Sequence, residues 1–128
     1  MISDMNRVTR QTRVGRWVRD TFGDGIAMSL TERAMRLVEE AVEAAQAVGL
    51  SQDKVLLIVG RVYNRPPGEL AQELGGVGVT LLAFAEAAGL SADRLERQEV
   101  KRIHEFPADK FRTRHAEKIA SGTAEAHA

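Results

Sequence analysis

The 128-residue chain contains no cysteine, only three prolines and few aromatic residues, and its formal charges cancel. Without cysteine it forms neither a disulfide nor a thiolate metal site. Because 18 basic residues balance 18 acidic ones, the composition does not indicate a strongly electrostatic nucleic-acid binder. No apolar run approaches the length of a membrane span, and the first residues, MISDMNRVTR, lack the apolar core of a signal peptide. We therefore expect a single cytoplasmic domain that has no membrane partner.

The hydrophobic content is 44%, although aromatic residues make up only 5% of the chain. Most of this content is Ala, Val and Leu, which favours closely packed helices. The apolar spacing and the positions of Ser, Gly and Pro predict an all-α bundle of four or five helices and no strand. The expected helices cover residues 7–22, 30–48, 51–63, 67–88 and 91–106.

The two ends of the chain differ from this expected core of residues 7–104. Residues 105–120 are basic, and we expect another helical turn or two there. Residues 1–6 and 121–128 are expected to be disordered tails.

The stretch QELGGVGVTLLAFAEAAG, residues 72–89, has features of a strand, a phosphate loop and a helix. Its three glycines each cost a helix roughly 1 kcal/mol relative to Ala. The glycine spacing fits neither GxGxxG nor a loop that ends in GK[ST]. Good helix formers flank the stretch, and its length favours a helix over a strand. Because residues 74–85 carry no charge, we expect this helix to be buried on nearly every side.

Glutamates cluster on the helix expected over residues 30–48. Glu39, Glu40 and Glu43 are three or four residues apart, so they are neighbours on the helix surface. Crowded carboxylates can bind a hard divalent cation such as Mg²⁺. The same carboxylates can also belong to an ordinary solvent-exposed face of the helix, where they form ion pairs with residues such as Arg36. Glu73 stands at the edge of the charge-free segment, where its partner is either a shared metal ion or an arginine.

These acids also resemble a known pattern. EEAVE at residues 39–43 is similar to the EExxE element of the MazG-like, all-α nucleoside triphosphate pyrophosphohydrolases, and ELGGV at residues 73–77 stands where that family has ExxD. The resemblance extends from Trp17 to about Arg102. It implies hydrolysis of a nucleoside triphosphate, often a deoxy or non-standard one, to the monophosphate and pyrophosphate by a homodimer or homotetramer.

The resemblance also implies a set of metal ligands. Mg²⁺, with Mn²⁺ as an alternative, would be held by Glu40, Glu43 and Glu73, and Glu39 would position a water molecule. Gly76 stands where ExxD ends in Asp, so one ligand is missing. Either water completes the metal site, or Glu99 substitutes for the missing acid, or the chain is a catalytically impaired nucleotide-binding or regulatory module.

Substrate-binding residues are expected around this site. We expect Glu39 or Glu40 to accept a proton from the attacking water. Trp17, the sole tryptophan, either stacks on the base or anchors the core. The cations that we expect to bind phosphates are Lys101 and Arg102, followed by Arg61 and Arg65. Each of them also has a second interpretation as an ordinary surface charge. A third hypothesis is a structural helical protein whose glutamates are simply solvated.

Overall fold

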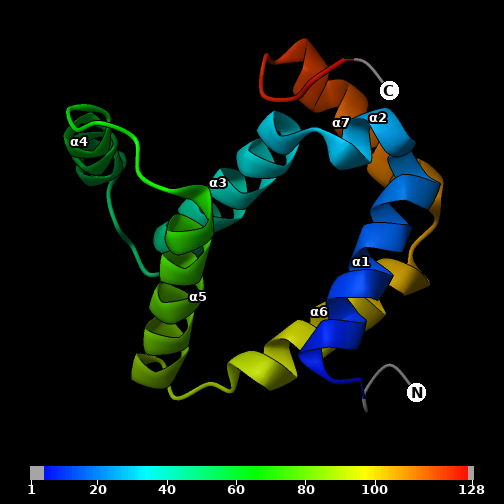
Figure 1. Cartoon of the computed structure of the whole chain (residues 1–128), viewed down its shortest axis with the longest axis horizontal. Coiled ribbons are helices and arrows are strands. Elements are labelled where there is room, and N and C mark those ends of the chain that lie inside the picture. The colour runs from blue at the N-terminus through cyan, green and yellow to red at the C-terminus, as the bar shows by residue number, and fades with distance from the viewer. Residues whose placement is uncertain (1–4, 127–128) are drawn as a thin grey trace. The chain divides into compact units, whose positions relative to one another are not determined.

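The computed structural model describes residues 5–126, and in these residues the chain forms seven α-helices and no strand (Figure 1). The all-α prediction is confirmed, whereas the predicted number of four or five helices is too low. The helices are α1 (Arg7–Phe22), α2 (Asp24–Met28), α3 (Leu30–Ala47), α4 (Gln52–Tyr63), α5 (Leu70–Ala87), α6 (Ala92–Glu105) and α7 (Ala108–Ala120).

Side-chain caps explain why the expected helix starts are close to the observed ones. The Asn6 side chain accepts a hydrogen bond from the Thr9 amide at 2.9 Å and caps α1. The Ser51 hydroxyl accepts one from the Lys54 amide at 3.2 Å and caps α4 in the same way. Such caps satisfy amides that have no partner inside the helix.

The two additional helices form where the sequence shows weak local signals. The expected helices left residues 23–29 without a helix, but Ile26 is buried there and α2 packs against α1. The basic segment forms the 13-residue helix α7, which is longer than the expected turn or two. α7 lies beside α1 (Figure 1), where Arg112 Nε donates to the Thr21 carbonyl at 2.8 Å. Contacts with distant residues therefore stabilise both helices.

The chain divides into two compact units, which are described separately. The first unit comprises residues 5–37 and 93–126, and the second comprises residues 38–92. The buried apolar side chains of the first unit include Val18, Ile26 and Val100. The single-domain organisation expected above stays a prediction.

Arg10 connects two helices of the first unit. Its side chain is only 4% exposed, and its guanidinium donates at 2.8 Å to Glu96 and at 2.8 Å to Asp93, both on α6. It also donates to the Met5 carbonyl at 2.6 Å. The buried charge is therefore paired and hydrogen-bonded, as a stable interior position requires.

The end of the chain also contacts the first unit. We expected residues 121–128 to be disordered, but the Arg36 guanidinium donates to the Thr123 carbonyl and the Ser29 hydroxyl donates to the Glu125 carboxylate at 2.6 Å. The Glu125 amide in turn donates to Glu32 at 2.9 Å. Residues 1–4 and 127–128 of the expected tails lie outside the described residues.

α5 confirms the helical interpretation of the glycine-rich stretch and begins three residues after the expected start at residue 67. After α5, Gly89 has a φ of 71°, a conformation in which side chains are strained. The expected burial is absent, because Ala85 is the buried residue of this helix in the described chain. A helix that is apolar on nearly every side thus remains largely uncovered.

In the described residues no single helix combines the length and apolar character of a membrane span. Among the described helices, α5 and α6 reach that length and apolar character only when they are taken together as one bent pair.

Candidate functional site

The predicted metal ligands of the second unit lie on α3 and α5. Glu39 is half-buried, and Glu40 and Glu43 are exposed on the last turns of α3. Glu73 lies in the first turn of α5. Among the described residues, Glu43 and Glu73 have no ion pair, so their charges are available to a ligand.

The Glu73 side chain bends toward the start of its own helix. Its Oε1 atom would lie 2.5 Å from a Cβ atom added at Gly68. A side chain at position 68 would therefore require the flexible carboxylate to move. The absence of a side chain at Gly68 leaves room for the carboxylate beside the backbone that precedes α5.

These acids do not converge into a metal site within one chain. In residues 5–126 no group of three or more His, Cys, Asp or Glu side chains is arranged to hold a metal ion. The predicted set of Glu40, Glu43 and Glu73 therefore does not by itself fit Mg²⁺ in the single chain, since a carboxylate site requires several oxygen ligands at close range.

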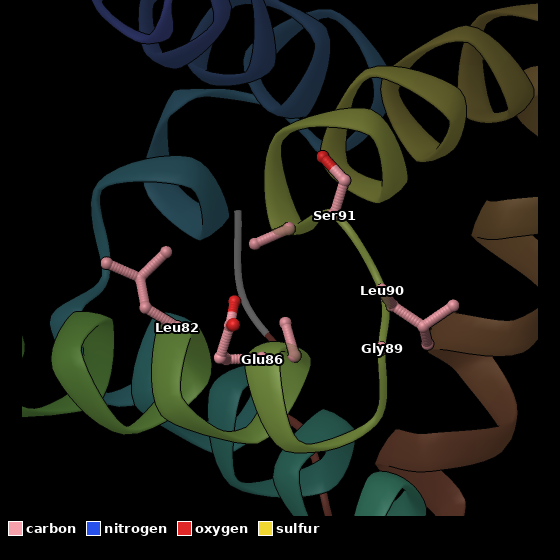
Figure 2. Close-up of a pocket in the computed structure, with 7 residues that line it drawn as sticks. Leu82, Glu86, Gly89, Leu90 and Ser91 are labelled. Atoms are coloured by element: carbon pink, nitrogen blue, oxygen red, sulfur yellow. The ribbon is translucent and has the colours of Figure 1, made fainter.

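The second unit contains a pocket of about 560 Å³ at the end of α5, and none of the predicted site residues lines it. Figure 2 shows Leu82 and Glu86 on α5 and Leu90 and Ser91 in the following turn. Glu86 is its single carboxylate, so the pocket offers no cluster of acids. Its lining residues are Leu82, Ala85, Glu86, Gly89, Leu90, Ser91 and Ala92.

Glu99, the proposed substitute ligand, belongs to the first unit and has an arginine partner. Arg102 Nε donates to its Oε2 atom at 2.9 Å. This hydrogen bond, together with the positive charge, holds the pKa of Glu99 below its usual range, although partial burial opposes the effect. A metal ion would have to compete with Arg102 for this carboxylate.

The cations predicted to bind phosphates are dispersed over three segments. On α6, Lys101 lies 3.8 Å from Glu105, and Arg102 also lies over the Phe106 ring at 5.4 Å from its centroid. Arg61 on α4 and Arg65 after it are exposed. In the described residues neither Arg61 nor Arg65 has an ion pair, so both remain available to an anion.

Trp17 packs among aromatic side chains of the first unit. Its ring meets Phe111 edge-on with centroids 5.0 Å apart, and it meets Phe22 in the same way at 6.0 Å. Such edge-to-face contacts are a favoured geometry of packed aromatic rings. This packing favours the core-anchor interpretation, and the base-stacking role stays a prediction.

The sequence analysis did not identify a buried polar cluster at the start of α3. Ser29 and Glu32 have the spacing of a capping box, and the Ser29 hydroxyl accepts a hydrogen bond from the Glu32 amide at 3.2 Å. The Glu32 carboxylate, however, is fully buried and pairs with Arg36 at 3.0 Å and Arg33 at 3.6 Å. The available sequence signal was Glu32 followed directly by Arg33, with Arg36 one helical turn later.

Comparisons of the chain with protein-family models, curated proteins and solved structures find no match. The resemblance described above therefore rests on the motifs themselves.

Proposed function

We propose that the protein is a cytoplasmic, Mg²⁺-dependent hydrolase that converts a nucleoside triphosphate to its monophosphate and pyrophosphate. The substrate is a deoxynucleotide or a non-standard nucleotide, and Mn²⁺ is an alternative cofactor. One observation carries the proposal: two acidic elements lie in the expected order on two helices of one unit, EEAVE on α3 and Glu73 in the first turn of α5.

The proposed fold is a MazG-like helical bundle that is completed by a homodimer or homotetramer. The exposed apolar residues of α4 and α5 support this assembly, because such side chains are normally buried. Since the acids of one chain do not converge, the proposal requires that Glu40, Glu43 and Glu73 approach one another in the assembled protein.

The residue roles follow from charge and accessibility. Glu40, Glu43 and Glu73 are the proposed ligands, and a bound divalent ion would screen phosphate charge and activate water. Glu39 or Glu40 is the proposed proton acceptor. Lys101, Arg102, Arg61 and Arg65 are proposed to hold phosphate oxygens.

An impaired nucleotide-binding or regulatory module is the second candidate. Gly76 offers no side-chain ligand, and Glu99 already pairs with Arg102. These two facts favour binding without turnover.

The direct test is a panel of nucleoside and deoxynucleoside triphosphates with Mg²⁺ or Mn²⁺, in which pyrophosphate and inorganic phosphate are measured separately. Pyrophosphate release from at least one substrate is expected. Glu43→Gln should lower this activity at least about 100-fold, because it removes a metal-binding charge. Glu117→Gln, at an exposed position on α7, is the matched control and should leave activity unchanged.

Nucleotide affinity separates the remaining outcomes. Binding without any release favours the regulatory module. The absence of both nucleotide and metal affinity would leave the glutamates as solvated surface residues and would refute the hydrolase.

A further inference from the structure

The balanced charge of the whole chain conceals two units of opposite sign. The first unit, residues 5–37 and 93–126, carries 15 basic side chains against 10 acidic ones. The second unit, residues 38–92, carries 3 basic side chains against 7 acidic ones. Salt screens exposed charges beyond about 8–10 Å, so the local balance of charge decides which partner a surface attracts. The first unit therefore offers cationic surface that the net charge of zero does not reveal.

Arginine recurs every three residues along α1, at five positions, and ion pairs account for two of them. Arg10 is buried against Asp93 and Glu96, and Arg7 lies 3.3 Å from Glu96. These two arginines therefore join α1 to α6. The other three are exposed and have no ion pair within the part of the chain that the structure describes; they are Arg13, Arg16 and Arg19.

These three residues, which we call the arginine face of α1, lie on one side of the helix. A step of three residues advances a helix by about 4.5 Å and turns it back by about 60°, so the face covers about a third of the circumference and about 9 Å of length. Val18 and Thr21, which are buried, lie on the opposite side. Asp20 is the single acid of α1 and lies in its last turn. The exposed side of α1 thus has an excess of positive charge.

We propose that the arginine face binds the phosphate backbone of a double-stranded nucleic acid without reading its sequence. Guanidinium groups form paired, charge-assisted hydrogen bonds with phosphate oxygens. A duplex carries one phosphate for about every 1.7 Å of its axis, so cations spread over about 9 Å meet several phosphates at once. The three arginines have no role in the proposed hydrolysis, and the inference does not depend on it.

The aromatic residues of α1 favour a duplex over a single strand. Proteins that bind single strands stack unpaired bases on aromatic rings. Trp17 and Phe22 instead pack edge-on against each other with centroids 6.0 Å apart, and Trp17 also meets Phe111 on α7. The arginine face itself has no aromatic ring, so its contacts are limited to the backbone of the nucleic acid.

The packing of α1 opposes a membrane as the partner. A helix that lies on a membrane inserts its apolar side among the lipids. The apolar side of α1 is already occupied, because α1 packs against α2 and α7 and buries Val18.

Fluorescence anisotropy with a labelled DNA duplex of about 20 base pairs tests the proposal at about 50 mM salt, where phosphate contacts are strong. The unmodified chain should bind with a dissociation constant of about 100 µM or less. Two duplexes of unrelated sequence should give the same constant within about twofold, because the contacts are to phosphates. Each neutralised phosphate contributes about −0.9 to the slope of log affinity against log salt, so three contacts predict a slope of about −2.7.

The arginine-face variant combines Arg13→Gln, Arg16→Gln and Arg19→Gln. It should raise the dissociation constant at least about tenfold and make the salt slope shallower by about 1 for each arginine. Lysine at the same three positions retains the charge and should restore most of the affinity. Circular dichroism checks that the helices are kept; if the combined variant unfolds, Arg16→Gln alone decides, and its slope should be shallower by about 1.

The matched control removes the same amount of charge from the second unit. Its three cations are changed together in Lys54→Gln, Arg61→Gln and Arg65→Gln. The dissociation constant for the duplex should then change less than about threefold, which corresponds to less than about 0.7 kcal/mol. Equal weakening in the two triple variants would show that net charge alone governs binding and would overturn the proposal.

Three further results would overturn the proposal. The first is no measurable binding of the duplex at about 100 µM protein. The second is tighter binding of a single strand than of the duplex of the same length, which would indicate contacts with unpaired bases. The third is retention on phosphatidylserine vesicles without duplex binding, which would indicate a lipid surface. None of these measurements reads hydrolysis, so an inactive protein that binds the duplex would refute the hydrolase and retain the arginine face.

Discussion

At the scale of single residues, Glu32 is notable because its charged side chain is completely removed from solvent. Arg36 at 3.0 Å, Arg33 at 3.6 Å and the Glu125 amide at 2.9 Å surround its carboxylate. Burial, followed by repulsion from Arg36, lowers the pKa of Arg33, and attraction to Glu32 opposes this shift. Glu32 therefore compensates two cations that have lost part of their hydration.

We expect Glu32→Ala to lower the free energy of unfolding by about 3–5 kcal/mol, because it leaves partly buried cations without a counter-charge. Urea unfolding followed by the fluorescence of the sole tryptophan measures this change. Glu117→Ala, at an exposed position, should change the stability by less than about 0.5 kcal/mol. Equal stabilities of the two variants would show that the buried cluster contributes nothing.

Asp93 leads to a prediction about pH. Hydrogen bonding from Arg97 and the charges of Arg97 and Arg10 hold the pKa of Asp93 below its usual range. A carboxyl whose pKa is lower in the folded state adds stability above its unfolded pKa, near 4, and loses it as the pH falls through the folded pKa. The urea midpoint should therefore decrease between about pH 5 and pH 3. Asp93→Asn should reduce the slope, and an unchanged slope would contradict this assignment.

At the scale of elements, α7 is held against α1 by aromatic packing. Trp17 on α1 lies edge-on to Phe111 on α7, and Phe111 meets Phe106 with centroids 6.5 Å apart. Lys110 lies over the Phe106 ring at 4.0 Å. The cluster explains how a basic segment with weak apolar periodicity forms a complete helix.

Trp17→Ala should lower the free energy of unfolding by about 3 kcal/mol, because it removes the largest ring of this cluster. Thermal unfolding followed by circular dichroism is the measurement. Trp17→Phe retains an aromatic ring and should lose less than about half as much. Unchanged stability in Trp17→Ala, together with a raised KM for a nucleotide, would favour base stacking instead.

At the scale of the whole molecule, the main feature is how little apolar surface the single chain buries. α4 has no buried residue, and most large apolar residues of α4 and α5 are exposed. In the proposed homo-oligomer, association adds to the stability of each chain, so unfolding should depend on concentration.

We expect the melting temperature to rise by about 3 °C for each tenfold increase in chain concentration, as mass action predicts for a dimer of this size. Differential scanning calorimetry over a hundredfold range measures it. A melting temperature independent of concentration in the unmodified protein would indicate that the chain is stable alone.

Local chemistry explains which elements could be predicted. The caps at Ser29 and Ser51 and the stop at Gly89 act within a few residues, so the starts of α3 and α4 and the end of α5 follow closely from the sequence. The additional helix α2 could not be predicted, because it depends on the burial of Ile26 where α2 packs against α1.

The candidate site was predictable only in part. Helical spacing places Glu39, Glu40 and Glu43 on one surface of α3 whatever the rest of the chain does. Whether Glu73 approaches them depends on packing between helices. The pairing of Glu99 with Arg102, by contrast, is a local contact between residues three apart on one helix.

The sequence by itself determined the helical class, the absence of thiol chemistry and the charge-free character of α5, because these depend on composition and short-range periodicity. Only the tertiary structure decided that Glu32 is buried beside two arginines and that the large apolar residues of α5 remain exposed. Burial depends on which distant segments meet, and residues near one another in the chain do not specify those encounters.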